Sequence, residues 1–418
     1  MYKQINENIF LWLIIGVNFF WDVFMSYYKY LPHILLFVIM IFYIIVYKKI
    51  KMDMQFVVII SCIMAHGLVN CFFGNTEASY MIIQVLTIII NYMAFSNVLE
   101  MYSIKNIISA YWKSAYFMGI IAIVQEICGI LGISNNSSIP VLRWFIRYFE
   151  NMSGHIVRVR GLCSEASFLG YYLAPAICII MFLILKNKLI SEEFKNEIKK
   201  RQMIVILLGF LFSFSAVAYI GLLIVFIIIL FSENNSFKKF FIIAGTLIVC
   251  YVVYSNIPFI KIRVDDTFAM FRNYGNNYNS VNLSSYTLYL AYVVTRKSLR
   301  YTLFLGGGIG SCSNMYSKFA LAGWGGQKLI LNSDDANSLF LRLLIEFGVI
   351  GIVTLVAFLV RNLPKQKNDN FVISMSILTL LFMILLRQGN YTHAGLLMYV
   401  YLYARIKKEE RRQFIKNK

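Results

Sequence analysis

Residues 164–185 read SEASFLGYYLAPAICIIMFLIL and carry a single charge, on Glu165, at the second position. An α-helix needs about 20 mostly apolar residues to cross the hydrocarbon core of a bilayer. The stretch has that length and composition. It therefore predicts a transmembrane helix.

Similar runs recur along the chain. Of its 418 residues, 59% are hydrophobic and 14% are charged, and the mean hydropathy is +0.68. These values exclude a soluble fold and predict an all-α polytopic membrane protein, a single transmembrane domain over residues 1–418. We expect twelve spans, near residues 9–26, 32–47, 55–73, 80–99, 107–131, 164–185, 203–214, 216–231, 240–257, 336–360, 371–387 and 391–405.

Two of the apolar runs could be taken for something other than a single transmembrane helix. The first, at 9–26, has no small-residue cleavage site and is followed directly by a second span, so we expect a retained helix. The run at 203–231 is too long for one crossing and short for two. We expect two short or broken helices there.

The distribution of lysine and arginine sets the expected topology. With the N-terminus inside, the basic clusters between spans fall on the cytoplasmic side, as the positive-inside rule requires. Both termini are then cytoplasmic. The clusters are Lys48, Lys49 and Lys51, residues 186–201, Lys238 and Lys239, residues 361–367, and the tail after Arg405.

This topology leaves two sizeable outer loops, at 132–160 and 258–335. Both are basic, which opposes the usual charge bias. One interpretation is contact with lipid headgroups. The other is that the cations bind an anionic substrate on the outer face.

The segment from Arg158 to Glu165 runs from the smaller loop into a span. Arg158 and Arg160 suit a phosphate site because the planar guanidinium holds two oxygens at once and stays charged in a low dielectric. Glu165 could orient an arginine or accept a proton. The structural alternative is an interfacial ion pair that only anchors the helix.

A second constellation joins the larger loop to the span at 336–360. It contains Asp335, Asn337, Arg342 and Glu346. Arg342 and Glu346 are four residues apart and can pair on one helix face. Ionisable groups inside an apolar run usually face a polar cavity. A purely structural pair is the alternative.

The remaining motifs indicate little chemistry. The glycine cluster at 305–311, LGGGIGS, could bring backbone amides to a phosphate, but it lacks the lysine of a P-loop, which favours a flexible connection or close helix packing. The histidines, His33, His66, His155 and His393, are far apart in sequence, and the seven cysteines scatter singly. We expect no metal and no other cofactor.

Together these features resemble the O-antigen polymerase and ligase superfamily, and within it the Wzy-type polymerases of bacterial surface polysaccharides. The resemblance rests on Arg-x-Arg-Gly-Leu-x-Ser-Glu at 158–165, Gly-x-Gly-Ser at 308–311, and Asn337-Ser-Leu followed by Glu346-x-Gly-x-x-Gly. The twelve-span layout, the large late outer loop and the broken pair around 213–215 are also similar. The layout covers nearly the whole chain.

The resemblance implies a GT-C-like glycosyltransferase in the bacterial inner membrane. Its substrate would be an undecaprenyl-pyrophosphate-linked oligosaccharide, and its partners would include the bilayer, a flippase and a chain-length regulator, with no nucleic acid. Arg158, Arg160, Glu165 and Asp335 are the catalytic candidates, with Glu165 or Asp335 as the base. Candidate substrate-binding residues are Arg263, Arg272, Arg296, Asn337, Arg342 and Glu346.

The sequence also allows other functions. The ligase branch typically has a histidine just before the asparagine of the second motif, whereas this chain has Asp335-Ala336-Asn337, which favours a polymerase over a ligase. A transporter of lipid or polysaccharide should show related halves, and no internal repeat is evident. A channel should show a filter-like motif, and no span repeats one.

Overall fold

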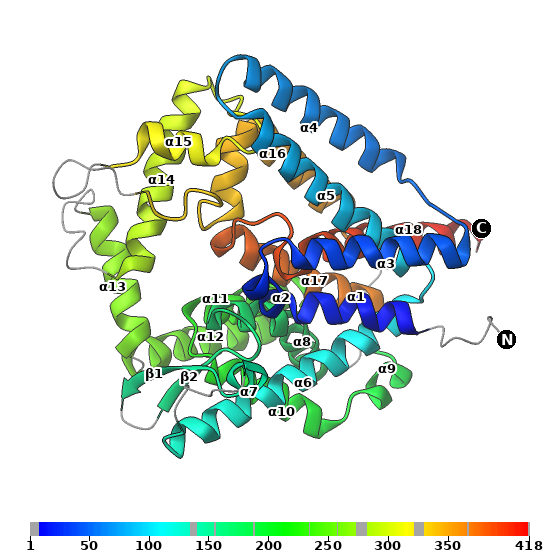
Figure 1. Ribbon diagram of the computed structural model, residues 1–418. Coiled ribbons are helices and arrows are strands. Elements are labelled where there is room, and N and C mark those ends of the chain that lie inside the picture. Colours follow the sequence, from blue (N-terminus) through cyan, green and yellow to red (C-terminus); the bar gives the residue numbers. More distant parts are fainter. Residues whose placement is uncertain are drawn as a thin grey trace.

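The computed structural model describes residues 8–133, 140–153, 156–186, 189–233, 235–256, 258–272, 282–321, 330–365 and 368–416. These residues form eighteen α-helices, one short 3-10 helix and one two-stranded antiparallel hairpin (Figure 1). The predicted all-helical class is confirmed. The hairpin, β1 (Tyr148–Ser153) and β2 (Ile156–Val159), was not expected.

Several helices are long and apolar enough to cross a membrane, so the chain is a multi-pass membrane protein. Within the described residues there are seven: α4 (Met54–Phe72), α5 (Ala78–Leu99), α6 (Ile104–Ile130), α8 (Ala166–Leu185), α12 (Ser236–Asn256), α16 (Leu339–Arg361) and α17 (Asp369–Arg387). An eighth candidate crossing is α1 (Ile9–Phe19) with α2 (Trp21–Tyr27), which meet at 67°. The apolar α3 (Leu31–Tyr47) is shorter. Twelve crossings remain a prediction.

The run at 203–231 is divided as expected. It forms α10 (Lys200–Phe212) and α11 (Ala216–Ser232), separated at Phe214, whose φ of +39° breaks the helical path. At 1.5 Å per residue these helices are about 20 and 26 Å long, less than the thickness of a hydrocarbon core. Neither is therefore long enough to cross a hydrocarbon core as a straight helix.

The two expected outer loops contain folded elements. The smaller holds α7 (Pro140–Phe145) and the hairpin, and the larger holds α13 (Pro258–Arg272), α14 (Leu283–Tyr301) and α15 (Cys312–Phe319). Helix α14 is amphipathic: Tyr286, Leu290 and Val294 recur every fourth residue and are buried. Parts of both loops, including His155, lie outside the described residues.

The basic segments meet on one side of the helix bundle. Lys105 contacts Glu193 of α9 (Glu192–Glu197) at 2.5 Å, and the amide of Ser191 donates to Asp369 at 2.8 Å. In Figure 1 the start of α1 and the end of α18 (Leu396–Lys416) lie on this same side. This arrangement agrees with an even number of crossings between the two ends.

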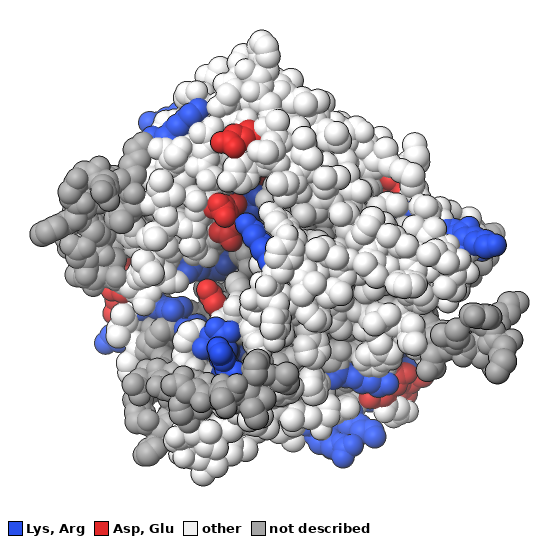
Figure 2. Space-filling model, viewed as in Figure 1, with Lys and Arg blue, Asp and Glu red and all other residues white. Residues whose placement is uncertain are grey.

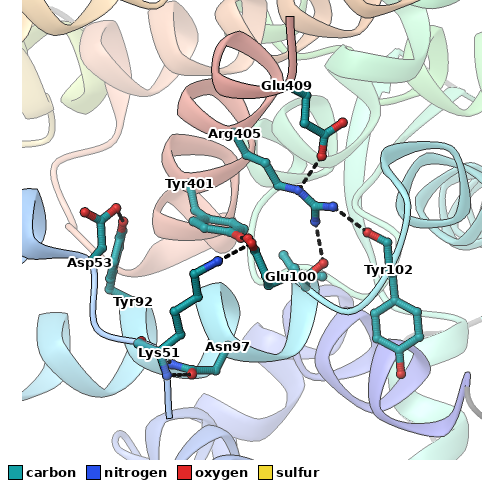
Figure 3. A network of polar contacts seen from close by, with 10 residues as sticks. Lys51, Asp53, Tyr92, Asn97, Glu100, Tyr102, Tyr401, Arg405 and Glu409 are labelled. Carbon is teal, nitrogen blue, oxygen red and sulfur yellow. Dashed lines mark hydrogen bonds and ion pairs between the residues drawn. The ribbon is translucent and has the colours of Figure 1, made fainter. Parts of the chain in front are cut away.

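A polar network joins the segment before α4, the end of α5 and α18, and is shown in Figure 3. We call it the tail network. Lys51 pairs with Glu100, while Arg405 pairs with Glu409 at 2.8 Å and donates to the carbonyls of Leu99 and Tyr102. It ties the start of α4 and the end of α5 to α18.

The glycine cluster at 305–311 packs closely against a break in α16. Gly348 has φ +59°, and a Cβ there would lie 1.9 Å from the carbonyl oxygen of Phe304. The amides of Gly307 and Gly308 donate to the carbonyls of Ile345 and Glu346, both at 2.8 Å. The close-packing interpretation of this motif is therefore the correct one, because these two amides are engaged within the protein.

Candidate functional site

A cavity of about 420 Å³ opens where the hairpin meets the membrane helices. We call it the arginine cavity. Figure 2 shows acidic and basic side chains gathered along a hollow in the middle of this face, beside a surface with few charges. Its described lining is Phe149, Arg158, Glu165, Ser167, Val217, Arg263, Asn282, Leu283, Ser284, Thr287, Asn332, Asn337 and Arg387.

The hairpin and α6 position the two arginines of the 158–165 motif. Phe149 pairs with Arg158 across the strands, and the guanidinium carbons of Arg158 and Arg160 lie 5.3 and 3.9 Å from the centre of its ring. Such contacts between cations and an aromatic face are attractive. The side chain of Gln125 accepts from the amides of Arg160 and Gly161 at 3.1 and 2.8 Å. The arginine motif is thus fixed to a membrane helix.

Arg160 stands at the edge of this group and is partly used in holding the fold. It donates to the carbonyls of Ser164 and Tyr148, at 2.9 and 3.3 Å. It is not among the described residues that line the arginine cavity. Arg158 is therefore the better placed of the two to contact a ligand there.

Glu165 lies at the N-cap of α8, where the helix dipole favours a negative charge. Ser167 donates to its carboxylate at 2.8 Å. On the opposite side Arg387 ends α17, where the dipole favours a cation, and it donates to the carbonyl and the hydroxyl of Ser284. Both charges therefore lie at helix ends whose dipoles favour them.

Cations outnumber carboxylates in the arginine cavity. Its described lining residues include Arg158, Arg263 and Arg387 and a single carboxylate, that of Glu165. Burial, together with the neighbouring Arg158 and Arg387, lowers the pKa of Arg263 to about 9, and burial, with Arg147 and Arg158, lowers that of Arg160 to about 10. Both remain protonated at neutral pH. A multivalent anion would relieve this repulsion and suits the site.

A second cavity, of about 270 Å³, lies behind the loop that contains Asp335. We call it the tyrosine cavity. Its described lining is Met25, Lys29, Tyr30, His33, Tyr80, Ile83, Gln84, Thr87, Gly310, Ser313, Asp334, Asp335, Arg342, Asn390 and Thr392.

The two cavities share a wall. Asn332 and Asn337 line the arginine cavity while Asp334 and Asp335 line the tyrosine cavity, an alternation that the positive φ of Asn332, Ala336 and Asn337 permits. The loop after α17 backs this segment closely, because a Cβ on Gly389 would lie 1.5 Å from the carbonyl oxygen of Asp335. Asp335 therefore belongs to the segment that separates the two spaces, and it lines the tyrosine cavity.

The environment of Asp335 suits a base. Burial raises the pKa of its carboxyl, although the amide of Asn337, which donates to it at 2.9 Å, and Arg342 act in the opposite direction. A higher pKa makes the carboxylate a stronger proton acceptor near neutral pH. Asn337 also reaches Thr287 at 3.2 Å and so links the loop to α14.

Arg342 and Glu346 form the buried pair that their spacing predicts, at 3.0 Å. Tyr391 donates to the same carboxylate at 2.7 Å, and Arg342 also donates to the carbonyl of Gly389 at 3.0 Å. Glu346 is fully buried, whereas Arg342 lines the tyrosine cavity. The pair holds the loop after α17 against α16, which agrees with the structural alternative for Glu346.

Four of the ten candidate residues thus line the arginine cavity, namely Arg158, Glu165, Arg263 and Asn337, and Asp335 and Arg342 line the tyrosine cavity. The structure does not bring Arg272 and Arg296 to either cavity. Both are exposed, at the end of α13 and on α14, and neither is among the described residues that line a cavity.

Arg387 was missed by sequence reasoning. The available signal was an arginine at the end of the span at 371–387 that the expected topology places outside, against the usual charge bias, the same signal that singled out Arg158. Gln125 was also missed, and a lone glutamine in an apolar helix gives no comparable signal.

Asp22 and His393 form a buried pair that the sequence did not suggest. His393 Nε2 lies 2.8 Å from Asp22 Oδ1, and Ser164 donates to the other carboxylate oxygen through its amide and its hydroxyl, at 2.8 and 3.1 Å. The pair ties α2, the segment before α8 and the loop after α17 together. His393 is thus a packing residue next to the site.

Comparison with known proteins finds no family model that matches this chain and no curated protein with significant similarity. The geometry of the two cavities therefore carries the functional argument.

Proposed function

We propose that the protein is a polymerase of undecaprenyl-pyrophosphate-linked oligosaccharide repeat units, acting on the outer face of a bacterial cytoplasmic membrane. The observation that carries the proposal is the arginine cavity, where Arg158, Arg263 and Arg387 converge around one carboxylate at the boundary of the membrane helices. The product would be an O-antigen or capsular polysaccharide. A flippase would supply the substrate, and a chain-length regulator would be a partner.

The proposed donor is a growing chain whose reducing-end sugar is bound to undecaprenyl pyrophosphate. Its pyrophosphate lies in the arginine cavity, with the guanidinium groups of Arg158, Arg263 and Arg387 on its oxygens. Charge on that group grows as the glycosidic bond breaks. Arginines fixed in advance stabilise this charge more in the transition state than in the ground state.

The transfer step needs a base and no nucleotide. The hydroxyl oxygen of the acceptor sugar attacks the anomeric carbon of the donor, the carbon–oxygen bond to phosphate breaks, and the electron pair leaves with undecaprenyl pyrophosphate. The hydroxyl proton passes to Asp335. Glu165 orients the arginines in this scheme, because it lies among them while Asp335 lines the neighbouring space.

Deletion of the gene in a polysaccharide-producing host, followed by complementation, tests the proposal. Wild type should restore the ladder of long glycans, and Arg263→Ala should leave a single repeat unit on its anchor. Arg300→Ala is a matched control, because Arg300 is an exposed arginine of the neighbouring α14. A ladder that persists in the deletion strain, or is unchanged by Arg263→Ala, contradicts the proposal.

A ligase that transfers finished chains is the second candidate, and one observation favours it. The expectation of a polymerase used the absence of a histidine beside Asn337, yet His393 directly follows Thr392, which lines the tyrosine cavity together with Asp335. The same gel separates the two functions. A ligase mutant would retain long chains on the carrier lipid and lose all attached glycan.

A further inference from the structure

We propose that the tyrosine cavity is the acceptor subsite, and that it binds the non-reducing terminal sugars of the incoming repeat unit. The inference rests on the proposed function and adds to it a second, separate binding site. The cavity is built by the start of α3, the first turns of α5 and three loops, around Gly310, Asp334 and Asn390. In Figure 2 the hollow in the middle of this face extends from a cluster of basic side chains at its lower end to a group of acidic and basic side chains above it.

The lining of the tyrosine cavity has the chemistry of carbohydrate recognition. A sugar ring presents hydroxyls around its edge and C–H groups on its faces. Carboxylates and amides bind the hydroxyls, and aromatic rings cover the C–H faces. Asp334, Gln84 and Asn390 supply the first kind of group, and Tyr30 and Tyr80 supply the second.

Charge separates the tyrosine cavity from the arginine cavity. Asp334 and Asp335 both line it, and the charge of Arg342 is matched by Glu346, which leaves Lys29 as the other cation among the described lining residues. Two carboxylates disfavour a pyrophosphate. A neutral, hydroxyl-rich group fits this space and the pyrophosphate fits the arginine cavity.

Because the two cavities share a wall, a donor and an acceptor bound in them would lie next to each other, as transfer requires. Asp335 lines the tyrosine cavity and also interacts electrostatically with Arg387 of the arginine cavity. A hydroxyl held in the tyrosine cavity would therefore meet the proposed base on the side that faces the donor. The volume of about 270 Å³ is small for a ligand site, which suits the end of an oligosaccharide and excludes its lipid.

Tyr80 is the most useful residue for a test. Its side chain is about half exposed in the first turn of α5, so its removal leaves the core intact. Tyr80→Ala removes the aromatic face, while Tyr80→Phe keeps that face and loses only the hydroxyl. Tyr27→Ala is a matched control, because Tyr27 is exposed at the end of α2 and is not among the described residues that line either cavity.

The assay uses the full-length protein in nanodiscs, with the host's lipid-linked repeat unit as donor. The acceptor is the same oligosaccharide, released from its lipid by mild acid and labelled at its reducing end, so that it can accept but cannot donate. Tyr80→Ala should raise the KM for the labelled acceptor about tenfold. Tyr80→Phe and Tyr27→Ala should leave it within about twofold, and the KM for the donor should not change.

The outcomes distinguish the inference from the proposed function. If the wild-type protein elongates the labelled acceptor and Tyr80→Ala leaves its KM unchanged, or raises the donor KM equally, the acceptor subsite lies elsewhere. If the wild-type protein elongates neither the labelled nor the lipid-linked acceptor, the proposed function fails and the inference fails with it. Arg263→Ala should lower kcat/KM for the donor and leave the KM for the labelled acceptor within about twofold, which shows that the assay separates the two substrates.

Discussion

The arginine cavity and the tail network are both clusters of charge at membrane boundaries, yet they are built differently. In the tail network three cations each bind a carboxylate of the protein: Lys51 binds Glu100, Arg405 binds Glu409, and nearby Lys407 binds Glu410. The space beside them is also lined by Arg361, Lys408 and Arg411. The described lining of the arginine cavity contains three arginines and one carboxylate, that of Glu165. Ion pairs between segments stabilise a fold, whereas arginines that line a cavity are placed to bind an anion.

The largest expected effect concerns Asp335, which lies beside the arginine cavity and has no counterpart in the tail network. Asp335→Asn keeps the volume and removes the proton acceptor. We expect kcat for chain transfer to fall about a thousandfold at saturating substrates. Glu77→Gln, which changes an exposed carboxylate at the start of α5, serves as control. A modest fall for Asp335→Asn would move the base to another residue.

The next effect concerns Arg387, the arginine that only the structure revealed. Arg387→Gln should lower kcat/KM for the lipid-linked donor about a hundredfold, because it removes one fixed positive charge from the leaving group. The free energy of unfolding should change little. Equal losses in activity and in stability would mean that Arg387 resembles the cations of the tail network instead.

The pH profile of transfer is a third test of the site. Burial raises the pKa of Asp335, so its carboxylate is protonated at a higher pH than that of an ordinary aspartate. Activity should therefore fall as the pH decreases through this raised value, by about tenfold per pH unit below it. An acid limb of kcat/KM at the usual aspartate pKa would contradict the assignment.

Loss of the Asp22–His393 pair should lower the free energy of unfolding more than it lowers the rate of transfer. His393→Ala leaves the buried carboxylate of Asp22 without its histidine and should lower the free energy of unfolding by about 3 kcal/mol. The double change of Asp22→Asn with His393→Ala should recover part of the loss, because no buried charge remains. Additive losses in denaturant unfolding would show that the two residues act independently.

The smallest effect belongs to the tail network. Glu100→Gln removes one partner of a half-exposed ion pair and should lower the free energy of unfolding by less than about 1 kcal/mol. The glycan ladder should not change. A shortened ladder would mean that the tail network also contributes to function, and the contrast with the arginine cavity would disappear.

The sequence predicted those features that depend on local composition. Apolar runs predicted the membrane helices and the break at 213–215, and basic bias in the outer loops singled out Arg158 and Arg263, which converge although 105 positions separate them. Helix periodicity also predicted the Arg342–Glu346 pair. These signals need no knowledge of tertiary contacts.

The remaining features depend on contacts between distant segments. Arg272 and Arg296 carry the same charge as Arg263, but their helices turn them toward solvent. The Asp22–His393 pair spans 371 positions, and the wall between the cavities depends on positive φ at Asn332, Ala336 and Asn337 of one folded loop. Charge and spacing along the chain therefore predict neither the buried pair nor the wall between the cavities.

Reconstitution tests the central claim most directly. The purified full-length protein in nanodiscs would receive the host's lipid-linked repeat unit alone, with no nucleotide sugar and with a chelator present. We predict a ladder of lengthening chains and the release of undecaprenyl pyrophosphate, both lost in Arg263→Ala. A wild-type protein that leaves every repeat unit at its starting length would contradict the account.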